Sequence, residues 1–165
     1  MKHVVFTFIS SDKPGLVDTL SNCIQQHQGN WLSSSMQQMS GFFTGVVEVS
    51  VQQAHVDGLV SQINAIPDLN IVVKIADEVI SESKTNLVLE LTANDRAGIV
   101  QEISSVIHQQ GGNLLKLVSK EESAAHSGQG LFKAKATISV VENNTNALIE
   151  SLENLADDLM VDITH

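Results

Sequence analysis

Two short segments of the chain combine an acidic residue, a cation and a glycine, and the second segment repeats the first 83 residues later. They read Ser11-Asp12-Lys13-Pro14-Gly15-Leu16-Val17 and Asn94-Asp95-Arg96-Ala97-Gly98-Ile99-Val100. Each follows a short apolar run and precedes an amphipathic one, a pattern that predicts a strand-to-helix turn. Backbone N–H groups point outward at such a turn and can hold a small anion. The sequence therefore predicts two related ligand-binding turns.

The elements that must position these turns follow the same order in both halves of the chain. In the first half, apolar spacing predicts strands at 3–10, 30–39, 42–51 and 69–76 and helices at 15–28 and 54–66. The second half repeats this order, but from its third strand onward the offset is 89 residues, because six residues are added within 121–129. An insertion at a hairpin tip, with the spacing kept on both sides, indicates a structural repeat.

The repeat predicts an α+β fold made of two ferredoxin-like βαββαβ units. We place the first unit at 1–78, a polar linker at 79–85 and the second unit at 86–165. Each unit is expected to form a four-stranded antiparallel sheet with two helices on one face. The opposite face of each sheet is then left open.

The open face is expected to differ between the two units. In the second unit it carries the polar residues Glu90, Lys133, Lys135 and Asp162. In the first unit we expect it to carry the apolar residues Val4, Phe6, Phe8, Phe42 and Val46. Large apolar patches on protein surfaces usually mark contacts. We therefore predict that this face of the first unit is covered by another domain or by a second chain.

Charge and composition argue against several classes of function. The net charge is −10, with three basic against seven acidic residues in 1–80 and six against twelve in 81–165. Direct binding to DNA or RNA is not expected, because basic residues supply most of the affinity for phosphates. The apolar run near the start is too short for a signal peptide, and no run reaches the ~20 residues that span a membrane. We expect a cytoplasmic protein without a membrane partner.

No pattern in the sequence predicts catalysis, a cofactor or a metal site. Nothing pairs a nucleophile with a base, and the six histidines lack the spacing of metal ligands. The single cysteine, Cys23, lies on the apolar stripe of a predicted helix. It is therefore expected to be a packed thiol, and one cysteine can form no intramolecular disulfide. The protein is expected not to be an enzyme.

The repeated turn and its surroundings resemble the ACT domain. The shared features are a strand, then Asp12-Lys13-Pro14-Gly15-Leu16-Val17, then a helix that ends in Gly29-Asn30, all within a βαββαβ unit. The second copy has Gly112-Asn113 at the corresponding place. Two such units in tandem, with no enzyme or helix-turn-helix attached, resemble the glycine cleavage system transcriptional repressor group.

The resemblance implies a non-catalytic regulator that senses a small amino acid, such as glycine, and restrains a transcriptional activator by protein contact. ACT domains pair side by side, which implies a homo-oligomer such as a dimer. Their ligands bind where the turn of one domain meets its neighbour. The carboxylate of the ligand would lie on backbone N–H groups, and its ammonium on Asp12, Asn94 or Asp95. The residues placed at the ligand are Asp12, Lys13, Pro14, Gly15, Leu16 and Asn30 in the first unit and Asn94, Asp95, Arg96, Ala97, Gly98, Ile99 and Asn113 in the second.

The candidate residues also have structural interpretations, which the sequence leaves open. The two turn glycines could serve close backbone packing, and the two aspartates could cap their helices. The two asparagines follow helix-ending glycines, of which Gly29 is expected to be a left-handed cap. Ala97 stands where the family has proline, so the second turn is expected to be less stiff and the two sites need not be equivalent. An interaction scaffold without a ligand is the alternative function.

Overall fold

The computed structural model describes residues 1–77, 86–125 and 127–164. The chain divides into two compact units, Met1–Ser81 and Glu82–His165, hereafter unit 1 and unit 2. The predicted linker, 79–85, lies outside the described residues.

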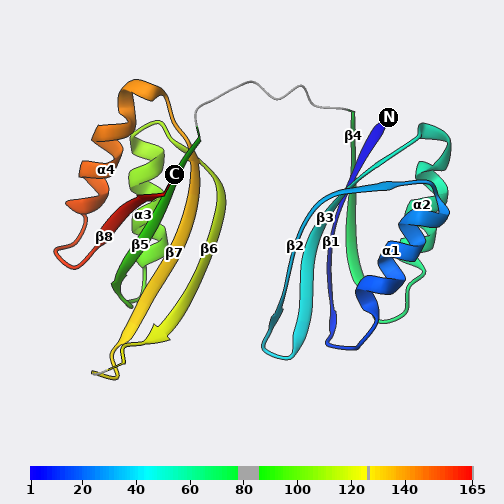
Figure 1. Cartoon of the computed structure of the whole chain (residues 1–165), viewed down its shortest axis with the longest axis horizontal. Helices are drawn as coiled ribbons and strands as arrows, with labels where there is room; N and C mark the ends of the chain where they lie inside the picture. Colours follow the sequence, from blue (N-terminus) through cyan, green and yellow to red (C-terminus); the bar gives the residue numbers. More distant parts are fainter. Residues whose placement is uncertain (78–85, 126, 165) are drawn as a thin grey trace. The chain divides into compact units, whose positions relative to one another are not determined.

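Unit 1 is a four-stranded antiparallel sheet with both helices on one of its faces (Figure 1). Its strands run in the spatial order β2-β3-β1-β4. A short 3₁₀ turn, η1, precedes the second helix. In chain order the elements are β1 (Lys2–Ser11), α1 (Leu16–Gln26), β2 (Asn30–Met39), β3 (Phe42–Val51), η1 (Gln53–His55), α2 (Val56–Asn64) and β4 (Asn70–Asp77).

Unit 2 repeats this arrangement, with strands in the order β6-β7-β5-β8. The predicted α+β fold of two ferredoxin-like βαββαβ units is therefore confirmed. The added residues lengthen the hairpin between its second and third strands. In chain order the elements are β5 (Asn86–Asn94), α3 (Ile99–Gln109), β6 (Asn113–Ser123), β7 (Gly130–Ser139), η2 (Glu142–Asn144), α4 (Thr145–Glu153) and β8 (Met160–Thr164).

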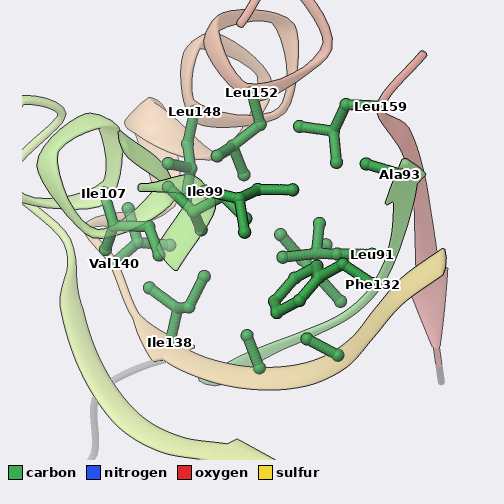
Figure 2. Close-up of a cluster of buried hydrophobic side chains, with 14 residues drawn as sticks. Leu91, Ala93, Ile99, Ile107, Phe132, Ile138, Val140, Leu148, Leu152 and Leu159 are labelled. Atoms are coloured by element: carbon green, nitrogen blue, oxygen red, sulfur yellow. The ribbon is translucent and has the colours of Figure 1, made fainter. Parts of the chain in front are cut away.

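Each unit has its own aliphatic core between helices and sheet. In unit 1, Leu20, Cys23 and Ile24 recur at helical spacing on α1 and are buried against Val47 and Val49 of β3. Burial raises the pKa of the Cys23 thiol, as expected for a packed cysteine. In unit 2, Figure 2 shows side chains of α3 and α4 that converge on the sheet. Each such side chain contributes about 1.5–3 kcal/mol of hydrophobic stabilisation.

The glycine at the end of α1 has a different role from the one that the sequence predicted. The left-handed residue is Gln28, with φ 56°, and not Gly29. A Cβ on Gly29 would lie 3.0 Å from both Ile24 Cγ2 and Val49 Cγ1, so this glycine permits the start of β2 to pass close to the core. Gly112 is in the same position in unit 2, 3.0 Å from Ile107 Cγ2, and there Gly111 is left-handed.

The prediction that residues of β1 lie on the open face of unit 1 is wrong for Val4, Phe6 and Phe8. Val4, Phe6 and Phe8 are at most 3% exposed and lie in the core. Strand β1 has apolar residues on both faces, so the alternation of residues along it does not decide which face packs against the helices. The pairing with β3 decides it, since Phe6 lies opposite buried Val47. Residues directly opposite in a ladder share a face.

The other two predicted residues do lie on the open face of unit 1. Phe42 is 50% exposed and Val46 is 39% exposed. Val46 is opposite Thr7, which in turn is opposite Val72 of β4. The face is therefore partly apolar, as predicted, although through a different set of side chains.

The open face of unit 2 is charged, as predicted. Glu90 and Lys135 lie opposite each other in the register, with Nζ and Oε1 3.8 Å apart. Glu122 lies between two lysines, forming an ion pair with Lys120 and another with Lys133 at 2.7 Å. The hydrogen bond from Lys120, followed by that from Lys133, lowers the pKa of Glu122 to about 2.

The lysine pair predicts a low titration midpoint for Glu122. Its pKa falls from an ordinary 4.5 to about 2 in the folded chain. The lysine contacts therefore favour the folded state fully above the unfolded value, and this contribution is lost as the pH falls toward 2. NMR titration of the side-chain carboxyl carbon should show this midpoint, and Lys120→Met should raise it. Lys135→Met is the matched control and should leave it unchanged. A wild-type midpoint near 4.5 would contradict the arrangement.

Candidate functional site

The two predicted turns have the same conformation and the same place in the fold. Each runs for four residues from the end of the first strand of its unit to the first helix. Gly15 precedes α1 with φ 87° and ψ 2°, and Gly98 precedes α3 with φ 89° and ψ −5°. Each turn is held to the neighbouring hairpin by an aspartate amide. Asp12 N–H donates to the Gly41 carbonyl at 3.3 Å, and Asp95 N–H to the Gly130 carbonyl at 2.9 Å.

The turn glycines are required by their backbone conformation and not by close packing. A Cβ on Gly15 would meet no atom within 4 Å, and one on Gly98 would meet only Glu102 Oε1 at 3.8 Å. Both residues are left-handed, a conformation that costs an L-residue with a Cβ roughly 1–2 kcal/mol. The packing interpretation is therefore wrong, and the space above each glycine is open.

The capping interpretation of the two aspartates is also wrong. Within the described part of the chain, no side chain caps the start of α1 or of α3. Asp12 instead accepts a hydrogen bond from Gln38 Nε2 at 2.7 Å, which ties the turn to the edge strand β2. Since the first turn of an α-helix has no intrahelical acceptors for its amides, the positive end of α1 is available to an anion.

A hollow of about 330 Å³ lies over the turn of unit 1. Three of the residues around it are charged: Asp12 and Asp18 carry carboxylates, and Lys13 carries an ammonium group. Three others, Leu16, Val17 and Phe43, are apolar. The lining residues are Asp12, Lys13, Gly15, Leu16, Val17, Asp18 and Phe43. This volume is at the small end of ligand pockets, and the two kinds of charge suit a small zwitterion.

Three of the lining residues, Val17, Asp18 and Phe43, are not among the predicted site residues. Asp18 is the acidic residue in the first turn of α1, and a signal for it existed, because a helical residue three positions after the glycine must lie near the turn. Phe43 comes from β3, opposite Ser10 near the end of β1. Only the strand register could have placed it at the turn.

Lys13 is held at the rim of the hollow by the loop between α2 and β4. Its Nζ is 2.6 Å from Asp68 Oδ2, and both side chains are more than 60% exposed. The hydrogen bond from Lys13 lowers the pKa of the Asp68 carboxyl. An exposed pair of this kind is weak, so Lys13 can change partners at little cost.

The turn of unit 2 has a different arrangement of charge. Arg96 donates two hydrogen bonds to Glu102 of α3, at 2.7 and 2.6 Å. This pair raises the pKa of Arg96 and lowers that of Glu102. The residue equivalent to Glu102 in unit 1 is Thr19, which bonds to the Gly15 carbonyl instead. A bidentate pair is stronger than a single contact, so the cation of the second turn is already occupied.

The remaining candidates of unit 2 differ in what they can offer. Ile99 is 5% exposed, and Figure 2 shows its side chain in the core. It can therefore contribute only its backbone. The amide of Asn94 donates to Asp158 Oδ2 at 2.7 Å. Ala97 and its counterpart Pro14 are exposed in their turns. The two sites differ at Glu102, which pairs with Arg96, and at Gln101, which stands where unit 1 has Asp18; the sequence reasoning singled out neither.

The two asparagines lie far from the turns of their own units. Asn30 pairs with Ser50 at one end of β3, whereas Phe42, at the other end, pairs with Ser11 beside the turn. Eight residues of strand, from 42 to 50, span ~26 Å. Asn113 is in the same position in unit 2, opposite Ser139. Either asparagine could reach a ligand only at the turn of a neighbouring unit.

Across residues 1–77, 86–125 and 127–164, no three histidine, cysteine or acidic side chains gather in a group that could hold a metal ion. Within the same ranges, no helix has both the length and the apolar composition needed to cross a bilayer.

The fold is similar to that of solved structures. No protein-family model and no curated protein matches the chain. A protein from Galdieria sulphuraria, described only as an unknown protein, matches with a TM-score of 0.80 and 21% identity over 100% of both chains. A protein described as a candidate glycine cleavage system transcriptional repressor matches with a TM-score of 0.67 and 18% identity, over 99% of this chain and 96% of that one. At these identities the likeness concerns the fold alone, which is that of two tandem ferredoxin-like units.

The left-handed turn predicts an unusual order of substitutions at Gly15. Alanine should destabilise unit 1 by about 1–2 kcal/mol through backbone strain alone. Asparagine should cost less than alanine although it is larger, because it adopts this conformation more readily and has open space around it. The single tryptophan, Trp31, packs against the core of unit 1, so its fluorescence in a urea titration reports on this unit. If asparagine costs more than alanine, packing controls the site.

Proposed function

We propose that the protein is a non-catalytic regulator that binds a small amino acid at the turn of unit 1. The observation that carries this proposal is the hollow above Gly15, which combines two carboxylates and one lysine beside the uncapped start of α1. An amino acid has one charge of each sign at a short separation. Its ammonium would contact Asp12 or Asp18, and its carboxylate would contact Lys13 and the amides of the first helical turn.

The hollow, of about 330 Å³, has room for a small amino acid such as glycine. Its apolar lining residues, Leu16, Val17 and Phe43, could contact an aliphatic part of the ligand. A neighbouring ACT-like unit would complete the site, and the asparagine at the start of its second strand, Asn30 or Asn113, would then be the additional contact. Unit 2 would bind more weakly through Asn94, Asp95 and Gly98, because Arg96 is engaged by Glu102.

We further propose that the protein acts by contact with another protein, namely a transcriptional activator. The net charge of −10 opposes direct binding to DNA, and the fold is shared with a protein described as a candidate repressor of the glycine cleavage system. A cytoplasmic regulator without an enzymatic step fits these properties. Ligand binding would change which arrangement of the chains is preferred, and with it the affinity for the activator.

An interaction scaffold without a ligand is the second candidate function. It is favoured by the contacts that the turn of unit 1 already makes. Gln38 satisfies Asp12, and Asp68 satisfies Lys13. A ligand must displace or share both contacts, whereas a scaffold would keep them.

Thermal unfolding in the presence of amino acids separates the two functions. A ligand at a hundredfold excess over its Kd stabilises the folded state by ~2.7 kcal/mol. For a unit of this size, that corresponds to a rise in Tm of roughly 10 °C or more, followed through Trp31. Asp12→Asn and Lys13→Met should abolish the rise. Arg96→Met, the matched change in the second turn, should leave it in place. A Tm unmoved by any of the twenty amino acids would favour the scaffold.

Partner capture tests the proposed mode of action. Tagged protein should retain a transcription factor from cell extract, and the amino acid that raises Tm should change the amount retained. Asp12→Asn should remove this dependence on ligand while the basal capture persists. The purified protein alone should give no shift of promoter DNA, even at low salt. A ligand-independent capture would contradict the sensing role, and a DNA shift by the protein alone would contradict action by protein contact.

A further inference from the structure

The open face of unit 1 contains a region without charged residues in a chain that is strongly acidic. The region consists of three neighbouring rows, where a row is a line of residues that lie opposite one another across the strands of the sheet. We call this region the neutral patch. It includes the exposed apolar residues Ile9, Met39, Phe42, Val46 and Val72. The other members are polar but uncharged, namely Thr7, Ser11, Ser35, Gln37, Thr44 and Asn70. The charged residues of the face, Glu48 and Lys74, lie in the next row, on either side of Val5.

The fold itself does not require this patch to be uncharged. In unit 1, one row reads Val46, Thr7 and Val72 across three strands. The same row of unit 2 reads Lys135, Glu90 and Asp162. In the adjoining row, Gln37 and Thr44 correspond to Lys120 and Lys133. Since unit 2 forms the same sheet with charges in these places, the apolar and neutral residues of unit 1 have another cause.

We infer that the neutral patch is a contact surface, and that it binds the same patch of a second copy of this chain. In a two-fold symmetric contact, each surface meets itself, so residues near the axis face their own kind. A charged patch would oppose like charges there, whereas the neutral patch has none. The overall charge of −10 makes this region favourable for approach between copies.

Other kinds of occupant fit the patch less well. A strongly acidic or basic partner would find no complementary charge among the residues of the three rows. A charged sheet face, such as the open face of unit 2, would have to give up the hydration of its lysines and carboxylates against an uncharged surface, which is costly. The hydroxyl and amide side chains of the patch can serve as both donors and acceptors toward an identical surface.

The size of the face sets the expected strength of the contact. The neutral patch spans four strands at ~4.8 Å spacing and about six residues of each at ~3.3 Å, which is ~380 Å² in projection. This area is below the ~800 Å² per partner of a standard interface. The contact should therefore dissociate on dilution. It is distinct from an edge-to-edge pairing of two sheets, because it buries a sheet face and not a strand edge.

Sedimentation velocity across a range of concentrations tests the inference. The wild-type mass should double with rising concentration. The double variant Val46→Lys with Val72→Asp, which copies the row of unit 2, should remain at half of the wild-type mass at the highest concentration. Ile75→Lys is the matched control, because Ile75 is 51% exposed on the same strand but belongs to the opposite face. This control should associate like the wild type, and the Trp31 unfolding curves should show that both variants are folded.

Cross-linking tests which surfaces meet. Thr7 lies in the centre of the patch, and Thr7→Cys should cross-link two copies with a short bifunctional maleimide. Val118→Cys, on the open face of unit 2, should not, and wild-type Cys23 is buried and serves as the blank. A wild type that stays monomeric at every concentration would overturn the inference. So would a double variant that associates as strongly as the wild type, or cross-linking through Val118→Cys alone.

Discussion

A left-handed residue between the first strand and the first helix is the constraint on which both units depend. At Gly15 and Gly98 the chain leaves the sheet and turns back over it, with φ near 90° in both places. This conformation directs each helix across its sheet, so that Leu20 in unit 1 and Ile103 in unit 2 become core residues. Because the space beside each glycine is open, the same constraint leaves backbone amides exposed to small molecules.

The two units have kept this geometry while their surfaces have diverged. Unit 1 has an accessible lysine at its turn and a neutral patch on its open face. Unit 2 has an arginine held by Glu102, and its open face carries charges in the rows that are neutral in unit 1. The neutral patch is thus suited to contacts, and the corresponding rows of unit 2 are suited to solvent. A duplicated fold can divide its tasks in this way because the residues concerned lie outside both cores.

Much of the fold could be predicted from the sequence, because spacing and repetition are local signals. Leu20, Cys23 and Ile24 define a helix stripe by themselves, and the offset of 83 residues between the two turns identifies the repeat. The face of β1 was not predictable in the same way, because Val5 and Ile9 are as apolar as Val4 and Phe8. Only the pairing with β3 decides between the two sets. The roles of Gln28 and Gly29 likewise depend on how closely β3 approaches.

The candidate site was predictable in its centre and not at its edges. Asp12, Lys13 and Gly15 are contiguous, so one motif reveals them. Phe43 reaches the hollow from another strand, and Asn30 is carried to the far end of the sheet, both of which follow from register. Glu102 closes a pair with Arg96 across six positions, a spacing that bridges turn and helix. Such relations come from three-dimensional packing and have no signature in composition.

The hydrogen bond between Asp12 and Gln38 connects the hollow with the β2–β3 hairpin, so ligand binding could alter that hairpin. Gln38 belongs to β2, the outermost strand of its sheet, and its amide holds the carboxylate that an incoming ammonium group would need. A carboxylate accepts more than one hydrogen bond, so the ammonium group can either replace the amide or share the carboxylate with it. A ligand whose ammonium group replaced the amide would release the tip of the β2–β3 hairpin, whereas a ligand that shared the carboxylate or bound to Asp18 would leave this contact in place. A single hydrogen bond thus connects the proposed ligand site at the turn with the edge strand β2.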